Sequence, residues 1–494
     1  AGIVLSDCLV TNNAMRKGTL KQSAYGGGIA AVDSAVNVSN CVVRENSAIG
    51  NWGGGGYTGG GGVALVRGAM TLADSVIAHN AVLAGTSFLL SGGVYTSAGT
   101  LAMRNCLVYG NSGQTVVTTT HGGALYLNGD ARLEHCTVAH NTLTGIRRAG
   151  GTVTVENSIL WGNLEDIVGT VAVRWSNIGD GTNEGIDGCI RADPLFDRGY
   201  YLSPGSPCAD AGTNTAAYWG LDGYTTRADG TGDSGRVDMG YHHAGGFAFD
   251  GADLYVAEDG DDADSGTAAD RPLRTMSRAL ASVRDGVRIH VAAGWYNQAG
   301  GESFPLTLTR VAGVRILGTN RAATVFDAGG AVAGNDNRVL TLDNVADVRL
   351  EGMTLTGGYY PGKNWGTFTG AGADILNSAV ELSDCAIVSN TIAGTGHQNS
   401  YGGGIRCYHS QAAIRACDLR RNTAQGSGVC ESQGGGMYIE GYSGVTVEES
   451  VLGENATFGG STGARFGGGI SYKGTALLMR NCLIAGNECV NSGA

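Results

Sequence analysis

The 494-residue chain contains 85 glycines and only 6 prolines, and its formal net charge is −12. Because the glycines follow no Gly-X-Y period, the composition excludes a collagen-like triple helix. Apolar residues make up 42% of the chain and charged residues 15%, which excludes a disordered polypeptide; the acidic charge argues against a nucleic-acid partner. We expect no membrane span, because no apolar stretch approaches about 18 residues.

The first residues, AGIVLSDCLV, contain neither a Met nor the basic region of a signal peptide, so we expect a mature or excised piece of a longer precursor. They also belong to a unit that recurs along the chain, as in GGGIAAVDSAVNVSNCVVRENSA from Gly26 and GGGIRCYHSQAAIRACDLRRNTA from Gly402. We number each unit from its recurrent small residue, which is position zero. The zero positions are Cys8, Cys41, Ser75, Cys106, Cys136, Ser158, Met353, Cys385, Cys417, Ser450 and Cys482.

The unit has the apolar pattern of β-strands. The residue two positions after zero is aliphatic in every unit, and the residue three positions before zero is apolar. This alternation, with a change of phase just before zero, predicts strands joined by a tight turn. One unit cannot bury its apolar face alone, so the units must stack. We predict an all-β parallel β-helix, a solenoid.

Position five after zero is asparagine in every unit but one, where Gly358 replaces it. Asparagine tolerates the left-handed backbone of a sharp turn, and stacked amides can hydrogen-bond from coil to coil. A side chain that recurs so often is structural rather than catalytic. The predicted ladder comprises Asn13, Asn46, Asn80, Asn111, Asn141, Asn163, Asn390, Asn422, Asn455 and Asn487.

The zero-position cysteines alternate with Ser and Met, which indicates small inward side chains rather than disulfides or metal ligands. The predicted inward stack comprises Cys8, Cys41, Cys106, Cys136, Cys385, Cys417 and Cys482. Cys189 and Cys208 share an irregular segment and form the candidate disulfide, if the compartment is oxidising. The sequence leaves open the redox state of Cys407, Cys430 and Cys489.

In chain order, residues 1–178 are predicted to form the C-terminal half of one β-helix and 179–249 a turn-rich closing region. Residues 250–300 form an opening region, and 301–494 the N-terminal half of a second β-helix. Within the opening region, Leu273, Met276, Leu280 and Val283 lie on one face of a predicted helix over Pro272–Val283. Such a helix would cover the open end of a solenoid.

An acidic run from Glu258 precedes this helix. Its residues Asp259, Asp261 and Asp264 are a candidate calcium site, and the alternative is a solvated turn, since the EF-hand spacing is absent. No other cofactor is expected. Insertion loops are predicted after the asparagines, and their aromatic residues either cover the sheet or stack on sugar rings. These aromatic residues are Trp52, Tyr57, Tyr359, Tyr360, Trp365 and Phe368.

The glycine clusters and the asparagine turn resemble the repeats of polymorphic outer membrane proteins and related right-handed β-helix surface proteins. The segment DPLF…YYLSPGSPCADAG…VDMG resembles the closing region of secreted choice-of-anchor proteins, and YVAEDGDDADSGT…RPLRTMSRAL…VAAGWY resembles their opening region. The resemblance implies a right-handed solenoid that is secreted or on the cell surface. The closing region departs from that pattern by ending in Tyr241, His242 and His243 with no sorting anchor.

The closing region precedes the opening region, and joining residue 494 to residue 1 would complete a coil of acceptable length. The chain is therefore either one period of an end-to-end fibre or a piece truncated at both ends. We expect a non-enzymatic extracellular fibre, adhesin or cell-surface stalk built by tandem or head-to-tail stacking of modules, so that its partner is itself; surface glycans are the second partner considered. The alternative is a polysaccharide-binding or polysaccharide-cleaving β-helix, although no carboxylate pair or other catalytic constellation is apparent.

Overall fold

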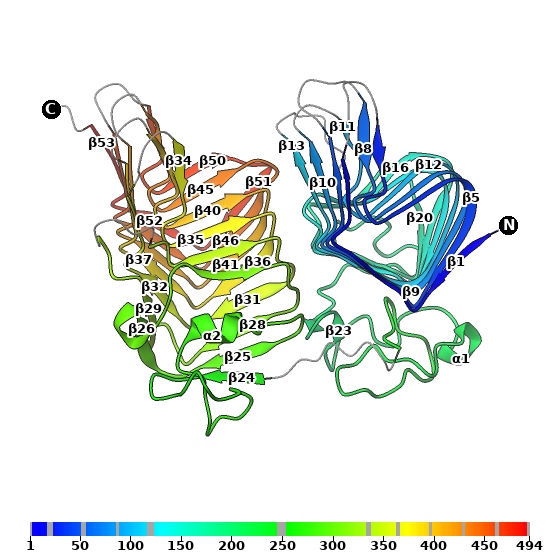
Figure 1. Ribbon diagram of the computed structural model, residues 1–494, viewed down its shortest axis with the longest axis horizontal. Coiled ribbons are helices and arrows are strands. Elements are labelled where there is room, and N and C mark those ends of the chain that lie inside the picture. The colour runs from blue at the N-terminus through cyan, green and yellow to red at the C-terminus, as the bar shows by residue number, and fades with distance from the viewer. Residues whose placement is uncertain are drawn as a thin grey trace. The chain divides into compact units, whose positions relative to one another are not determined.

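The computed structural model describes residues 2–16, 23–50, 56–84, 88–115, 123–244, 253–331, 337–361, 366–394, 398–426, 430–459 and 464–491. The chain divides into two compact units, Ala1–Phe249 (unit 1) and Asp250–Ala494 (unit 2). Each unit contains its own parallel β-solenoid, whose strands stack as successive layers in Figure 1. The predicted all-β solenoid is therefore confirmed. In the described part of the chain, no helix is long and apolar enough to cross a membrane.

The solenoid sheets of unit 1 are parallel, and the longest strands run around a corner of the coil. The main stack is β1 (Ile3–Ser6), β5 (Ile29–Ser39), β9 (Val63–Ala78), β12 (Val94–Tyr109), β14 (Gly123–Glu134), β16 (Thr144–Gly150) and β19 (Glu165–Val168). The same sheet includes β2 (Leu9–Thr11), β6 (Val42–Arg44), β15 (Thr137–Ala139), β17 (Val153–Glu156), β18 (Ile159–Trp161), β20 (Ala172–Arg174) and β21 (Asn177–Ile178). Two smaller sheets are β3 (Ala14–Arg16), β7 (Ser47–Ile49), β10 (Ala81–Ala84), β13 (Ser112–Thr115), and β4 (Ala24–Tyr25), β8 (Tyr57–Gly59), β11 (Phe88–Leu89). The closing region adds the antiparallel pair β22 (Phe196–Asp197) and β23 (Tyr201–Leu202) and the helix α1 (Ala216–Trp219).

The described strands of unit 2 form five parallel sheets. The first is β24 (Asp253–Val256), β25 (Arg288–Val291), β28 (Arg315–Gly318), β31 (Val348–Glu351), β36 (Ala379–Ser383), β41 (Gln411–Arg415), β46 (Gly444–Glu448) and β51 (Ala476–Arg480). The second is β26 (Gly294–Asn297), β29 (Thr324–Asp327), β32 (Thr354–Thr356), β37 (Ala386–Val388), β42 (Asp418–Arg420), β47 (Val451–Gly453) and β52 (Leu483–Ala485). The third is β27 (Leu306–Thr309), β30 (Leu340–Asp343), β35 (Ala373–Leu376), β40 (Ile405–Tyr408), β45 (Met437–Glu440) and β50 (Ile470–Lys473).

The remaining two sheets of unit 2 come from segments that the sequence predicts as insertion loops. They are β33 (Tyr359–Pro361), β38 (Thr391–Ala393), β43 (Thr423–Gln425), β48 (Ala456–Gly459), β53 (Glu488–Asn491), and β34 (Gly366–Thr369), β39 (Gln398–Tyr401), β44 (Ser432–Gln433), β49 (Arg465–Phe466). The prediction of loops is wrong here, because each insertion pairs with the insertions of the neighbouring coils and so satisfies its backbone groups.

Each solenoid is filled by columns of aliphatic side chains in register. In unit 2 the column three positions before zero includes Leu350, Leu382, Ile414 and Val447, which pair strand to strand and are all buried. Each such side chain contributes about 1.5–3 kcal/mol on burial. The columns on successive coils merge into one core per unit.

The turns of the coil lie next to the predicted positions but not on them. In every predicted unit the residue before zero and the residue before the asparagine position have a positive φ, as in Asp384 (47°) and Ser389 (57°). The asparagines themselves, such as Asn390, do not. The prediction that asparagine adopts the left-handed conformation is therefore wrong. The recurrence of asparagine at position five after zero must therefore be explained by its side chain.

The glycine clusters pack against these asparagines. Gly402 has a φ of 71°, and the next two glycines are pressed between coils. A Cβ on Gly403 would lie 2.4 Å from the carbonyl oxygen of Thr423, and one on Gly404 would lie 2.9 Å from the side-chain amide of Asn422. Glycine is required because the coil closes here by bringing backbone against backbone and against the amide.

The capping helix is shorter than predicted. Helix α2 spans Met276–Leu280, with the Thr275 hydroxyl as its N-cap, and packs against β24 and β27; a 3₁₀ turn, η1, spans Gln298–Gly300. Leu273 is not helical, because its N–H donates to the carbonyl of Tyr255 and extends the sheet by one bridge to Val256. The predicted face is thus divided between a strand-like segment and a single helical turn.

The close packing around Gly404 predicts a large cost for a single methyl group. We expect Gly404→Ala to lower the free energy of unfolding by about 1–3 kcal/mol or more, since a Cβ would lie 2.5 Å from the carbonyl oxygen of Gly436. Gly300→Ala is the matched control, because only one atom lies within 4 Å of its Cβ, at 3.7 Å. Urea denaturation followed by circular dichroism measures both; equal midpoints would contradict the packing argument.

Candidate functional site

The predicted asparagines lie in two amide ladders. The Nδ2 of Asn390 donates to Oδ1 of Asn422 at 3.0 Å, and the backbone N–H of Asn390 donates to the same oxygen at 3.1 Å. The Nδ2 of Asn422 also donates to the carbonyl of Ile387 in the preceding coil at 2.8 Å. Side-chain amide bonds of 2.9–3.0 Å join Asn13, Asn46, Asn80, Asn111, Asn141 and Asn163 in unit 1, and Asn390, Asn422, Asn455 and Asn487 in unit 2.

Both ladders have the same polarity. Each asparagine presents two donors to the following coil and one acceptor oxygen to the preceding coil, as Asn455 does toward Asn487 and Asn422. A ladder therefore ends with donors in the direction of the C-terminus and with an acceptor in the direction of the N-terminus. The two ends of a solenoid therefore differ chemically, because one end presents hydrogen-bond donors and the other presents an acceptor.

In unit 1 the donors at the end of the ladder are taken up by a carboxylate that sequence reasoning missed. Asn163 donates through Nδ2 to Oδ1 of Asp166 at 2.8 Å, and the N–H of Asp180 donates to Oδ2 at 3.0 Å. Burial raises the pKa of Asp166 to about 7. Its position three residues after a ladder asparagine is the sequence signal that could have found it.

The zero-position side chains form a second row, the thiol row. The N–H of Cys8 donates to Sγ of Cys41 at 3.4 Å, and the N–H of Cys41 donates to Oγ of Ser75 at 3.1 Å. Cys106, Cys136, Cys385 and Cys417 are buried like Cys41, whereas Cys8 and Cys482 are partly exposed. A thiol or hydroxyl fits the row because it accepts from one coil and donates to a carbonyl two residues earlier, as Cys41 does to Ser39 at 3.1 Å.

The candidate disulfide is not formed: Cys189 and Cys208 are both free. Cys189 packs into the core of unit 1, while Cys208 receives a hydrogen bond from Nδ2 of Asn177 at 3.1 Å. Each thiol thus has its own environment within the same segment, so the expectation of a bridge is wrong. Cys407, Cys430 and Cys489 are also free.

The candidate calcium site is not assembled. Within the described residues, no group of three His, Cys, Asp or Glu side chains could hold a metal ion. Asp261 accepts from the N–H of Ala263, and Asp264 pairs with Arg271 at 3.2 Å, so these carboxylates are turned toward their own loop; Asp259 joins no such group. The carboxylate of Asp262 binds the N–H and hydroxyl of Thr275 and fixes the start of α2. The run serves as a turn.

Charged residues form a third row that the sequence did not reveal. On the outer face of the first sheet of unit 2, Arg349, Glu381, Arg415, Glu448 and Arg480 pair alternately across successive coils, at 3.4, 3.6, 3.0 and 3.6 Å. The pairing appears only when residues two and four positions before zero are aligned across coils.

The closing region is attached to the outside of the unit 1 solenoid by a buried polar network. Nε2 of His242 lies 2.8 Å from Oδ2 of Asp233, and both side chains are buried. The N–H and carbonyl of His242 exchange hydrogen bonds of 2.7 and 2.8 Å with the side chain of Asn105, a residue that directly precedes a zero position. Burial lowers the pKa of His135 and His243 to about 3, so both are neutral near pH 7. The departure at Tyr241–His243 noted in the sequence is thus part of the attachment.

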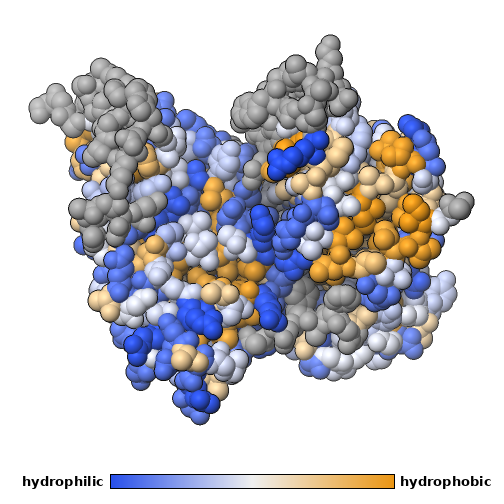
Figure 2. Space-filling model, in the orientation of Figure 1, coloured by the Kyte–Doolittle hydropathy of each residue, from blue (hydrophilic) through white to orange (hydrophobic). Residues whose placement is uncertain are grey.

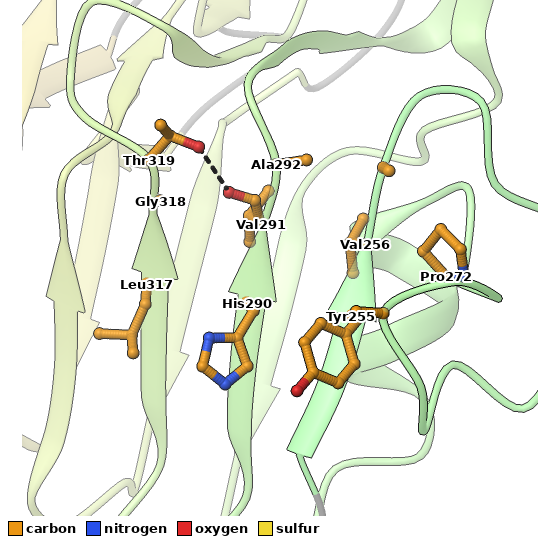
Figure 3. Close-up of a pocket in the computed structure, with 11 residues that line it drawn as sticks. Tyr255, Val256, Pro272, His290, Val291, Ala292, Leu317, Gly318 and Thr319 are labelled. Carbon is orange, nitrogen blue, oxygen red and sulfur yellow. Dashed lines mark hydrogen bonds between the residues drawn. The ribbon is translucent and has the colours of Figure 1, made fainter.

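A cavity of about 360 Å³ lies beside the first strands of unit 2 (Figure 3). Tyr255 and His290 lie side by side on β24 and β25 with their rings stacked 4.9 Å apart, and Leu317 follows on β28. The hydroxyl of Thr319 donates to the carbonyl of Val291 at 3.4 Å. None of the described residues that line this cavity is a carboxylate.

Two of the insertion aromatic residues pack against each other. The rings of Tyr360 and Phe368 are 4.8 Å apart, and the guanidinium of Arg338 lies over Tyr360. Tyr359 is half-buried in β33 and Tyr57 is exposed on β8. The remaining two, Trp52 and Trp365, lie outside the described residues.

Strand pairing and the amide ladders define a parallel β-helix protein. Residues 258–459 match the model of a family of unknown function, DUF1565. Among solved structures, the chain is similar to pectate lyase Pel9A, with 14% identity over 49% of this chain and 79% of that one, and a TM-score of 0.23. It is also similar to a mutant of the PL6 family alginate lyase AlyGC, with 12% identity over 99% and 97%, and a TM-score of 0.23. No curated protein matches the chain.

The ladder predicts that an asparagine within the amide row contributes more to the free energy of unfolding than an asparagine outside the row. We expect Asn422→Ala to lower the free energy of unfolding by about 2–4 kcal/mol, since two buried donors of Asn390 lose their acceptor. Asn399→Ala removes one hydrogen bond, from the N–H of Glu431, and should cost about 1 kcal/mol. Urea denaturation of the two variants provides the comparison; equal losses would refute a special role for the ladder.

The raised pKa of Asp166 predicts a pH dependence. Since the folded pKa of about 7 lies above the ordinary value of 3.8, the folded state holds the extra proton, and stability falls as pH rises from 4 to 7. The free energy of unfolding should fall by at most about 1.4 kcal/mol per pH unit over this range. Asp166→Asn should lose this component, so its stability relative to the native protein should rise between pH 4 and pH 7. A constant difference over that range would contradict the assignment.

Proposed function

We propose that this chain is a non-enzymatic extracellular structural protein whose molecules stack head to tail into a β-solenoid fibre or cell-surface stalk. The last coil of unit 2 (β51, β52 and β53) would pair with the first coil of unit 1 (β1, β2 and β3) of a second copy. The resemblance of the repeats to secreted β-helix surface proteins supports the extracellular placement. The observation that carries the proposal is the matching polarity of the two coils.

The amide ladders supply that polarity. Asn487 presents its N–H and Nδ2 in the direction in which Asn455 donates to Asn487 itself. At the other end, Oδ1 of Asn13 occupies the position at which Asn46 accepts from Asn13. Placing Asn487 of one copy next to Asn13 of another would continue the ladder with the same bonds. Two identical ends would instead place donors against donors.

The two coils also expose apolar side chains that the rest of each solenoid buries. Ile3 is 55% exposed, although Val36, its partner in the next coil, is 3% exposed. Ile484 is 54% exposed, whereas its neighbour Leu452 is fully buried. Apolar atoms gather over the first strands of unit 1 in Figure 2. These side chains are the ones that a further coil of the same type would cover.

Such a contact joins two different surfaces, and a contact of this kind that is repeated without closure makes a filament. The register of the columns would be kept, because both coils have the same spacing of apolar, zero and asparagine positions. The junction would then have the same amide hydrogen bonds and apolar contacts as two neighbouring coils within one solenoid.

Stacking predicts a selective effect of charge on the last coil. The native protein should form rods by electron microscopy and sediment as a concentration-dependent series. Ile484→Lys would bury a charge at the junction and should weaken association by at least about tenfold. Leu478→Lys is the matched control: this residue is 44% exposed in the same coil but belongs to an outward row, so association should persist.

A native protein that stays monomeric at every concentration would overturn the proposal. So would equal association of the two lysine variants, because the contact would then not involve the core face of the last coil.

A further inference from the structure

The cavity beside the first strands of unit 2 is closed on one side by the opening region. Leu273 bridges to Val256, and the N–H of Tyr255 donates to the carbonyl of Gly266 at 2.8 Å. These bonds hold the segment that follows β24 against the edge of that strand. Three residues of the segment line the cavity: Ala257, Ala269 and Pro272. The cavity is therefore built by the way in which the opening region is attached to the solenoid.

The floor of the cavity is aromatic and apolar, although the row to which it belongs is charged or polar elsewhere. Tyr255, His290 and Leu317 pair strand to strand on β24, β25 and β28, and each is half-buried (Figure 3). The same row continues through Glu351, Ser383, Arg415, Glu448 and Arg480. The row loses its polar character only beside the cavity, as expected if a ligand covers this part of the sheet.

Tyr255 and His290 form a stacked pair with a polar edge. Their ring planes are inclined by 15° and their centroids lie 4.9 Å apart. Nε2 of His290 is 3.7 Å from Oδ2 of Asp253, beyond hydrogen-bond distance, and it has no hydrogen-bond partner in the described part of the chain. The side chains of His290 and Asp253 are 36% and 32% exposed, so solvent reaches this edge. The pair combines an apolar ring surface with unused hydrogen-bonding capacity.

The lining fits a neutral sugar ring. Of the described residues that line the cavity, none is Asp, Glu, Lys or Arg, so a charged ligand group would be buried there without a partner. A pyranose ring carries C–H groups on its faces and hydroxyl groups around its edge. It therefore matches aromatic rings bordered by a phenol and an imidazole. The volume of about 360 Å³ lies within the range of small-ligand sites, about 300–1,000 Å³.

We propose that this cavity binds a neutral pyranose residue of an extracellular polysaccharide. The ring of the sugar lies against Tyr255 and His290, and its hydroxyl groups hydrogen-bond to the phenol and the imidazole. Binding is non-covalent, and no bond of the sugar is broken. This site goes beyond the fibre proposed above, because no contact between copies takes part in it. The two proposals share only the extracellular placement, which supplies the polysaccharide.

Isothermal titration calorimetry of the full chain with defined tetrasaccharides tests the site. The neutral probes are cellotetraose, laminaritetraose, mannotetraose, galactotetraose and chitotetraose, and tetragalacturonate is the charged comparison. At least one neutral probe should bind with a Kd of about 1 mM or lower, and tetragalacturonate should bind at least about tenfold more weakly. Absence of binding by every neutral probe, or a preference for tetragalacturonate, would overturn the proposal.

Two substitutions locate the binding. Ala269 is exposed at the rim of the cavity, so Ala269→Leu fills the cavity without removing a core contact, and it should raise the Kd at least about tenfold. His290→Ala should have a similar effect. Tyr472→Ala is the matched control, because this tyrosine is 42% exposed on β50 and does not line the cavity, so its Kd should equal that of the native protein. Circular dichroism verifies that each variant is folded. An unchanged Kd in folded Ala269→Leu would overturn the assignment to this cavity.

The sugar site and the fibre fail separately. Rods that bind none of the neutral probes would overturn the sugar site and leave the fibre. A protein that binds a probe but stays monomeric at every concentration would overturn the fibre and leave the sugar site.

Discussion

The structure depends on contact between a buried amide and a glycine at one corner of each coil. The side-chain amide of Asn422 donates to both neighbouring coils, and Gly404 leaves the space in which the amide lies. Neither residue works without the other, because a side chain at Gly404 would displace the amide and a shorter residue at Asn422 would leave donors unpaired. Coil after coil, this contact fixes the register in which the aliphatic columns stack. The hydrophobic core gives each solenoid most of its stability, while the corner determines which layers face each other.

The sequence predicts the stacked positions well and the turns poorly. Period and residue type located the aliphatic columns and the asparagines, because every coil repeats the same environment. The left-handed residues escaped prediction because they share no chemistry: Asp384, Ala416 and Glu449 all have φ near 50°. Each is held there by hydrogen bonds of the stack, which outweigh a conformational cost of about 1–2 kcal/mol. Asparagine was assigned to the turn because it often occurs in turns, although its amide is what the coil uses.

Features that depend on how neighbouring coils align could not be predicted from the sequence either. The alternating charges from Arg349 to Arg480 become pairs only once the register is known. The same holds for the insertions, which become strands because the insertions above and below them pair. By contrast, Cys189 and Cys208 were linked by proximity in sequence, which is a weak guide in an irregular segment. Local sequence patterns therefore predicted the coil. The charge pairs and the insertion strands on its outer face required the three-dimensional alignment of the coils.

The separation of corner and insertion has a consequence for how such a chain can change. Between Asn390 and Gly402 the chain leaves the coil and returns through β38 and β39, while the corner stays in place. The length of this insertion can vary, because the asparagine amide before it and the glycines after it return the chain to the same position in the coil. New surface can therefore be added to a single layer by lengthening one excursion, without disturbing the layers beneath it. In evolution or in the laboratory, the solenoid is a scaffold on which peptides of different length could be displayed at regular intervals.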